Sequence, residues 1–237
     1  MKLFAGIAIG ITLFVGDNLL PRPLPFLTDG TSFKYAITGK RPGAAVENTD
    51  AALRIVVVNR NGNAIASSGL LSYYNDKHEV HSVYVVRFAC DSLNYYVHAT
   101  NWCYEAPGTS NEQTEYAGDS LRYPLNMHIN DSLPSAWTTR KSSTKSGVAL
   151  YSMEFNNRYV YRIDTLDTQL GPMPAFRIIT NVSYSTKYDH HEFGKDKSSG
   201  EFVLTEWFIP SIGVVRTLID GRDFGTSKSE LISFGKE

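Results

Sequence analysis

The sequence holds a few clusters of histidine and carboxylate residues that could bind a metal. The first is Lys77-His78-Glu79-Val80-His81. The zinc-protease motif places two histidines four positions apart on one helical face, whereas His78 and His81 are three apart and open a strand-like segment. Side chains three apart on a strand face opposite sides, so we expect surface histidines here and no metal site.

Asp189-His190-His191-Glu192 is the stronger metal candidate because it lies in a predicted loop, where several side chains could converge. Adjacent side chains of an extended chain diverge, however, and one cluster supplies too few placed ligands for a closed site. We therefore expect a solvated loop, with no metal and no other cofactor.

The sequence contains only isolated candidates for nucleophilic or acid-base catalysis. The run Ser142-Ser143-Thr144-Lys145 matches Ser-x-x-Lys by letter, but no helix is predicted to hold the pair, and no Gly-x-Ser-x-Gly elbow is present. Cys103 and His98 could be a thiol and its base, yet on a strand they face opposite sides. Asp164 and Asp167 are a conceivable acid/base pair beside a predicted turn. No catalytic residue is predicted.

Aromatic side chains are the other feature that could form a site. The chain has 14 Tyr and 12 Phe, and many of its rings fall in one part of the sequence. Such rings could line a groove for a sugar or a lipid, but core and cross-strand packing explains most of them. The set is Tyr73, Tyr74, Tyr84, Tyr95, Tyr96, Trp102 and Tyr104.

The elements that must position these residues are predicted to be antiparallel strands, because β-branched and aromatic residues alternate with turn signals and no crossover helix is found. Asn61-Gly62 and Asp91-Ser92 predict hairpin turns. We expect an all-β fold, one large, strongly curved sheet or open barrel of ten or eleven strands with at most short helices. The predicted strands are 33–38, 53–59, 64–74, 81–88, 93–102, 148–155, 159–164, 176–184, 201–208, 214–220 and 227–234.

The remaining stretches predict irregular structure. Residues 106–120, 137–146 and 185–199 are polar and indicate loops or a short helix, and Asn156-Asn157 indicates a turn. Gly171-Pro172-Met173-Pro174 predicts a break that neither a helix nor a central strand would hold. In the sequence EWFIPSIGVVRT, Trp207 is predicted to be a buried anchor, Pro210 to end a strand and Gly213 to let the chain re-enter the sheet.

The N-terminal segment 1–19 has the layout of a signal peptide. Lys2 precedes an apolar run from 3 to 15, and a proline-rich exit follows at Pro21 and Pro23. The run is shorter than the roughly 18 residues that a membrane-spanning helix needs, although an uncleaved anchor is the alternative. We expect residues 20–237 to form a single antiparallel β domain, exported to the periplasm or envelope and not integral to the membrane after signal removal.

Charge and cysteine content limit the partners and the covalent links. The 23 basic and 24 acidic residues are balanced, with no basic patch for a phosphate backbone, so nucleic acid is excluded as a partner. In an exported chain, Cys90 and Cys103 invite a disulfide. The predicted hairpin would instead hold them roughly 33 Å apart, at about 3.3 Å per residue, so we expect unpaired thiols and keep the disulfide as the alternative.

Four segments resemble a known family: a Trp-aromatic stretch before Gly-Val-Val-Arg, a Tyr-Pro and Leu-Pro pair, a Cys-Asp turn before an aromatic strand, and a Pro-Ala step. They are 206–217, 122–125 with 131–134, 90–96 and 174–178. They are similar to segments of TapB-like exported bacterial envelope proteins of unknown function. The resemblance implies an envelope protein with a curved sheet akin to lipoprotein-carrier folds, and it brings no catalytic residue.

The sequence therefore favours an exported protein that binds a hydrophobic or glycan ligand on its curved sheet. The alternative is a structural or assembly component of the envelope that acts through protein partners. A hydrolase is the least favoured interpretation, because no motif supports it, and we expect a non-enzymatic protein.

Overall fold

The computed structural model describes residues 30–40, 46–61, 64–75, 77–103, 113–192, 194–222 and 225–236. The predicted signal segment 1–19, Tyr104 and the hairpin residue Gly62 lie outside these residues. Every statement below on the fold and its side chains refers to the described ranges.

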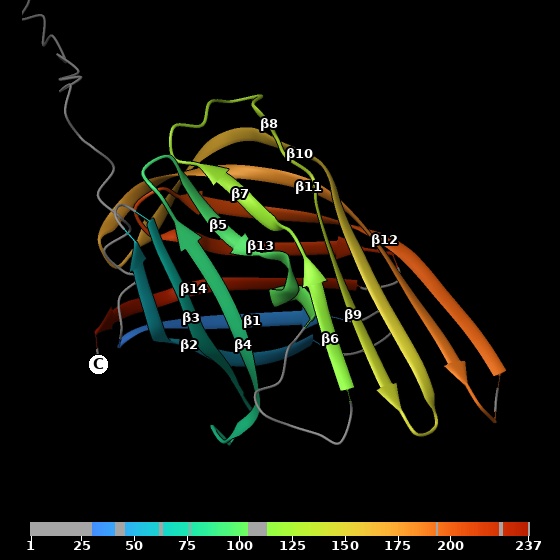
Figure 1. Cartoon of the computed structure of the whole chain (residues 1–237). Coiled ribbons are helices and arrows are strands. Elements are labelled where there is room, and N and C mark those ends of the chain that lie inside the picture. The colour runs from blue at the N-terminus through green and yellow to red at the C-terminus, as the bar shows by residue number, and fades with distance from the viewer. Residues whose placement is uncertain are drawn as a thin grey trace, which may run out of the picture.

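The described chain is almost entirely antiparallel sheet, with a short 3-10 helix, η1, as its helical element (Figure 1). The elements are β1 (Thr31–Lys40), β2 (Val46–Asn61), β3 (Ala64–Tyr74), β4 (Val80–Cys90), β5 (Asn94–His98), η1 (Ala99–Cys103), β6 (Gln113–Gly118), β7 (Ser120–Pro124), β8 (Ser132–Leu133), β9 (Ala136–Thr144), β10 (Gly147–Thr168), β11 (Gly171–His190), β12 (Gly194–Ile209), β13 (Gly213–Gly221) and β14 (Gly225–Lys236).

These strands form one 14-stranded sheet in the order β6-β9-β10-β11-β12-β13-β14-β1-β2-β3-β4-β5-β7, with β8 pairing off this path to β10. The end strands β6 and β7 are joined through Asp119. The Asp119 amide donates to the Trp137 carbonyl at one end of the sheet, and the Ala99 amide donates to the Asp119 carbonyl at the other. One stretch of chain thus brings both ends together, and the sheet is rolled into a nearly closed barrel shape (Figure 1).

The rolled sheet confirms the predicted fold class, and its curvature has local causes. Register shifts interrupt the pairing of β10 with β11 between Asn156 and Tyr159 and between Val160 and Arg162. Bulges of this kind bend a strand and increase its twist. Asn157 has a φ of 50° within this bend, which Asn tolerates better than most residues. The prediction of a turn at Asn156-Asn157 is therefore wrong, because β10 bends there and continues.

Several stretches predicted to be irregular are strands. The described part of 106–120 contains β6 and the start of β7, residues 137–146 contribute most of β9, and residues 185–199 complete the β11–β12 hairpin. Together with the neighbouring part of β10 they form an arm that extends beyond the rolled part of the sheet, at the lower right of Figure 1. Residues 187–189 and 194–199 of this arm are exposed and residues 139–144 are intermediate or exposed, so the alternation that marks a half-buried strand is absent there.

The predicted break at Gly171–Pro174 is also wrong, since both prolines belong to β11. Pro172 and Pro174 pair with Asp167 and Thr165 of β10, whereas the pairing of β11 with β12 begins only at Phe176. This end of β11 has a neighbour on one side only, where a residue without an N–H is tolerated.

The predicted turns at Asp91-Ser92 and Pro210 are confirmed. Cys90 pairs with Tyr95 across the first turn, whose Asp91 side chain accepts from the amides of Leu93 and Asn94, both at 2.7 Å. The strand predicted over 93–102 ends earlier, at His98, because the chain turns into η1. Cys90 and Cys103 are both buried and form no disulfide with each other in the structure.

The core lies mainly inside the rolled sheet, where alternate residues of each strand point inward. In β12 the inward file is Phe202, Leu204, Glu206 and Phe208, all buried, while the intervening Val203 is exposed. Within the described residues, no helix has the length and apolar character needed to cross a membrane.

Candidate ligand-binding cavity

The interior of the rolled sheet is not completely filled. A cavity of about 310 Å³ lies between β1–β5 and η1 on one side and β12–β14 on the other, which is at the lower end of the roughly 300–1,000 Å³ typical of small-molecule sites. Most of its wall is apolar or aromatic. That wall includes Phe33, Tyr35, Leu53, Leu71, Tyr73, Val86, Phe88, Tyr95, Val97 and Trp102.

The strand alternation explains why these side chains converge. Tyr35 of β1 pairs with Ala51 of β2, and Ala51 pairs with Tyr73 of β3, so the three residues form one row on the inner face. Directly paired side chains point to the same side of a sheet. Because Ala51 is small, the row leaves space between two tyrosines, and all three residues line the cavity.

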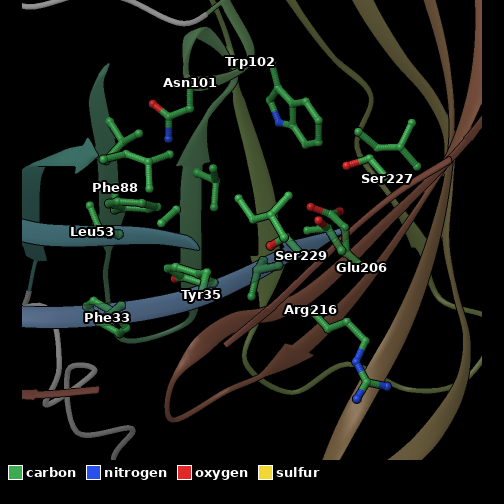
Figure 2. A pocket seen from close by; sticks show the side chains of 18 of the residues that line it. Phe33, Tyr35, Leu53, Phe88, Asn101, Trp102, Glu206, Arg216, Ser227 and Ser229 are labelled. Carbon is green, nitrogen blue, oxygen red and sulfur yellow. The ribbon is translucent and has the colours of Figure 1, made fainter. Parts of the chain in front are cut away.

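A polar wall faces the aromatic one. Figure 2 shows Phe33, Leu53 and Phe88 on one side, and Glu206, Ser227 and Ser229 on the other. Arg216 also borders the cavity, but its side chain points away from it in this view. The cavity therefore has a mostly apolar side and a mixed side, on which hydroxyl groups and one carboxyl group lie among Ile212, Val214 and Ile219.

Glu206 is hydrogen-bonded to one buried residue, which in turn packs against another. Its side chain is 2% exposed, and its Oε1 accepts a 2.8 Å hydrogen bond from the Tyr123 hydroxyl. The guanidinium of Arg158, only 1% exposed, lies 5.0 Å from the centre of the Tyr123 ring and donates to the carbonyls of Pro134 and Arg122. Glu206, Tyr123 and Arg158, in this order of contact, form a buried polar group, which we call the buried triad.

Burial raises the pKa of Glu206, although the charge of Arg158 and the hydrogen bond from Tyr123 act in the opposite direction. Burial also raises the pKa of Tyr123 well above its ordinary value, so this phenol stays protonated and donates. Glu206 Oε2 is buried with no hydrogen-bond partner among the described residues, and so are Nε and Nη2 of Arg158. An unsatisfied polar atom in a core is costly, which makes Oε2 the notable feature of this wall.

The other face of the same strand carries a second polar cluster. Trp207 donates from its indole nitrogen to Asp164 Oδ2 at 2.7 Å and lies between the guanidinium groups of Arg177 and Arg216, 4.9 and 5.4 Å from its ring centre. Partial burial would raise the pKa of Asp164, but the Trp207 hydrogen bond and the charges of Arg177 and Arg162 hold it below its usual range. Trp207 is buried, as predicted.

The structure does not bring the two candidate metal clusters together as ligand sets. His78 is an exposed turn residue 3.9 Å from Asp50, and His81 is exposed on β4. Asp189 forms an ion pair with Lys195, and His190 accepts from the Glu192 amide. Within the described ranges, no group of three or more His, Cys, Asp or Glu side chains could hold a metal ion.

The nucleophile and acid/base candidates are also separated. Ser142 is within hydrogen-bonding distance of Thr114, while Lys145 is exposed in the following turn. Asp164 and Asp167 lie three apart on β10, so they face opposite sides of the sheet.

Cys103 and His98 likewise have different partners. His98 Nδ1 lies 2.7 Å from the Thr100 hydroxyl, whereas Cys103 Sγ lies 3.3 Å from the Thr138 hydroxyl. Burial raises the pKa of Cys103, and this opposes thiolate formation.

The predicted aromatic set is divided between the cavity and other surroundings. Tyr73, Tyr95 and Trp102 line the cavity. Tyr84 packs edge-on against Tyr73, and Tyr96 donates to Asp91. The sequence analysis missed Glu206, Tyr123 and Arg158 as site residues. One signal was available for Glu206, which is a carboxylate within the apolar segment 202–209.

Two solved structures share this fold. The crystal structure of a candidate lipoprotein from Parabacteroides distasonis is 14% identical, with a TM-score of 0.63 over 88% of this chain and 96% of that one. A candidate exported protein with a YmcC-like fold from Bacteroides fragilis is 13% identical, with a TM-score of 0.59 over 88% of this chain and 97% of that one. At these identities, both similarities concern the fold.

No curated protein matches the sequence. The TapB-like resemblance is not matched by these comparisons by name and stays a prediction. The sequence pattern of the DUF3108-like family, by contrast, matches residues 28–219, which is most of the chain. The protein therefore belongs to the DUF3108-like family.

Proposed function

We propose that this protein is exported to the cell envelope and binds a hydrophobic ligand inside its rolled sheet. The observation that carries this proposal is the cavity of about 310 Å³, lined on one side by aromatic and aliphatic residues of β1–β5. Burial of apolar surface is the main source of affinity for such sites, and a few polar groups then fix the orientation.

The apolar wall favours a lipid over a glycan. Sugar-binding sites present several polar side chains along the faces they contact, whereas the wall from Phe33 to Val97 presents mostly hydrocarbon and rings. Binding in place of catalysis is favoured because the nucleophile and base candidates of the sequence have different partners and lie apart.

The proposed location rests on three agreeing features. Segment 1–19 has the layout of a signal peptide. The two proteins of similar fold are described as a candidate exported protein and a candidate lipoprotein. The motif resemblance to TapB-like envelope proteins agrees with both. We propose the periplasm or the envelope surface as the site of action.

Native mass spectrometry of the mature protein purified from its own envelope tests this function, with organic extraction of any bound molecule. A co-purifying lipid of defined mass is the expected result. A protein without bound lipid that also fails to bind a neutral apolar dye would overturn the proposal.

One observation supports an envelope assembly role as a second candidate. Residues 194–202 of β12 pair with β11 only, because pairing with β13 begins at Val203. This stretch of the arm is an open strand edge, and such edges can accept a strand from another chain. The same spectrum would show a protein partner that remains bound.

A further inference from the structure

The polar wall of the cavity is a row of three residues set by strand register. Glu206 of β12 pairs with Thr217 of β13, and Thr217 pairs with Ser229 of β14. All three line the cavity. The next residue in the row, Ile37 opposite Ser229, is apolar. We call Glu206, Thr217 and Ser229 the polar row.

The polar row has unused hydrogen-bonding capacity. Oε2 of Glu206 is buried without a partner, while Oε1 is occupied by Tyr123. Thr217 and Ser229 make no side-chain hydrogen bond to the described part of the chain. Three groups with free capacity therefore face a cavity whose lining is mostly apolar or aromatic, as Figure 2 shows for Glu206 and Ser229.

The buried triad limits the charge that this end can accept. The guanidinium of Arg158 carries a positive charge, and Glu206 is the only buried carboxyl group of the described residues. With Glu206 ionised, the triad is neutral overall. A cationic head group would then leave a net positive charge in the core, and an anionic one would lie against a carboxylate.

A hydroxyl group suits Glu206 in both of its protonation states. A hydroxyl donates to an ionised carboxylate and accepts from a protonated one. An ammonium group can only donate, and an ionised carboxylate or phosphate can only accept. The hydroxyls of Thr217 and Ser229 likewise both donate and accept, so they complete hydrogen bonds to the same head group.

The size of the cavity limits the apolar part of the ligand. At about 310 Å³ it is comparable to the smallest drug-sized sites, so it accepts one hydrocarbon chain and not a pair. The apolar and aromatic lining residues of β1–β5, such as Phe33, Phe88 and Val97, lie across from the polar row and would contact that hydrocarbon chain.

We propose that the ligand is a single-chain lipid with an uncharged, hydroxyl-bearing head group, which the polar row of Glu206, Thr217 and Ser229 receives. This inference rests on the proposed function and names its substrate class.

The test uses three probes of equal chain length: 1-dodecanol, dodecylamine and dodecanoate. Each competes with the neutral dye N-phenyl-1-naphthylamine, bound to the mature protein at neutral pH. We expect 1-dodecanol to bind about fivefold or more tightly than either charged probe, which corresponds to roughly one net hydrogen bond. Thr217→Val and Ser229→Ala should each weaken 1-dodecanol binding about fivefold more than they weaken dye binding.

The exposed Thr226 of β14 provides the matched control, and Thr226→Val should change neither affinity. If the dye binds and the three probes compete equally, the cavity binds apolar ligands and the head-group inference is overturned. Preferred binding of dodecanoate or dodecylamine overturns it as well. If neither dye nor probe binds, the proposed function fails first, and the inference fails with it.

Discussion

The hydroxyl of Tyr123 donates a 2.8 Å hydrogen bond to Oε1 of Glu206, a residue 83 positions further along the chain. The guanidinium of Arg158 lies over the ring of Tyr123, 5.0 Å from the ring centre. Strands β7, β10 and β12 therefore meet at one buried polar group beside the cavity. Its two charged members are the only buried charged residues in the described ranges.

Arg158 and Glu206 should be energetically coupled. Replacing Arg158 by Met leaves a buried carboxyl group without its compensating charge, which costs about 3–5 kcal/mol of unfolding free energy. Glu206→Gln removes that charge, so the double variant should lose at least about 0.5 kcal/mol less than the sum of the single losses. Urea unfolding at pH 7 measures the cycle. Additive losses would show that the two side chains act independently.

Asp164 should stabilise the fold at neutral pH and lose this effect in acid. Its pKa is lowered from 3.8 in the folded state, so its contribution is present above the unfolded value and is lost as the pH falls through the folded value. Asp164→Asn should cost about 1–3 kcal/mol at pH 7, and the difference from wild type should shrink below pH ~3.8. Urea unfolding across this range measures it, with the exposed Asp167→Asn as the control. A difference that stays constant in acid would contradict the assigned role.

Gly213 is required at the turn that returns β13 to the sheet. Its φ is 108°, and a Cβ there would lie 3.3 Å from the Tyr95 ring, which lines the cavity. Gly213→Ala should lower the free energy of unfolding by about 1–3 kcal/mol, since both the backbone and the ring must adjust. In Gly39→Ala the added Cβ meets no atom within 4 Å, so that variant should unfold close to wild type. Equal thermal stability of the two variants would be inconsistent with this constraint.

Both thiols should be inaccessible in the folded protein and free in the unfolded one. Cys90 and Cys103 are 2% and 1% exposed and form no disulfide. Titration with Ellman's reagent should detect no thiol in buffer and two after unfolding in urea without a reductant. If the unfolded protein shows no thiol until a reductant is added, the cysteines are paired.

The half-buried strands could be predicted from sequence because one periodic pattern serves both local structure and burial. In β12, the inward Phe202, Leu204 and Phe208 lie an even number of positions apart, and the predicted strand 201–208 lies within Gly194–Ile209. The Pro210 turn and the Gly213 return were predicted from a different, purely local signal. Each depends on the backbone preference of one residue type.

The arm could not be predicted because most of its residues are partly or fully exposed on both faces. Residues such as Ser142, Thr186 and Ser198 carry no alternation of burial, and pairing with neighbouring strands holds them extended. The prolines of β11 show the same limit. A rule that excludes proline from central strands does not apply where a strand has one neighbour, and neighbours are a property of the fold.

The candidate site was only partly accessible from sequence. The aromatic set identified Tyr73, Tyr95 and Trp102 as possible lining, and all three line the cavity. The polar row depends on register between β12, β13 and β14, which places Glu206 beside Thr217 and Thr217 beside Ser229. Long-range pairing of this kind has no local signature, so the inward position of Glu206 could be suspected only from its apolar surroundings.

The most direct test of the central claim is dye binding by two neighbouring alanine variants. Ala51 lines the cavity between Tyr35 and Tyr73, whereas Ala52 is the next residue on the same strand and faces the opposite side of the sheet. Titration with N-phenyl-1-naphthylamine should show that Ala51→Phe weakens binding at least about tenfold by filling the cavity, while Ala52→Phe binds as wild type does. Equal dye affinity in the two folded variants would contradict binding inside the rolled sheet.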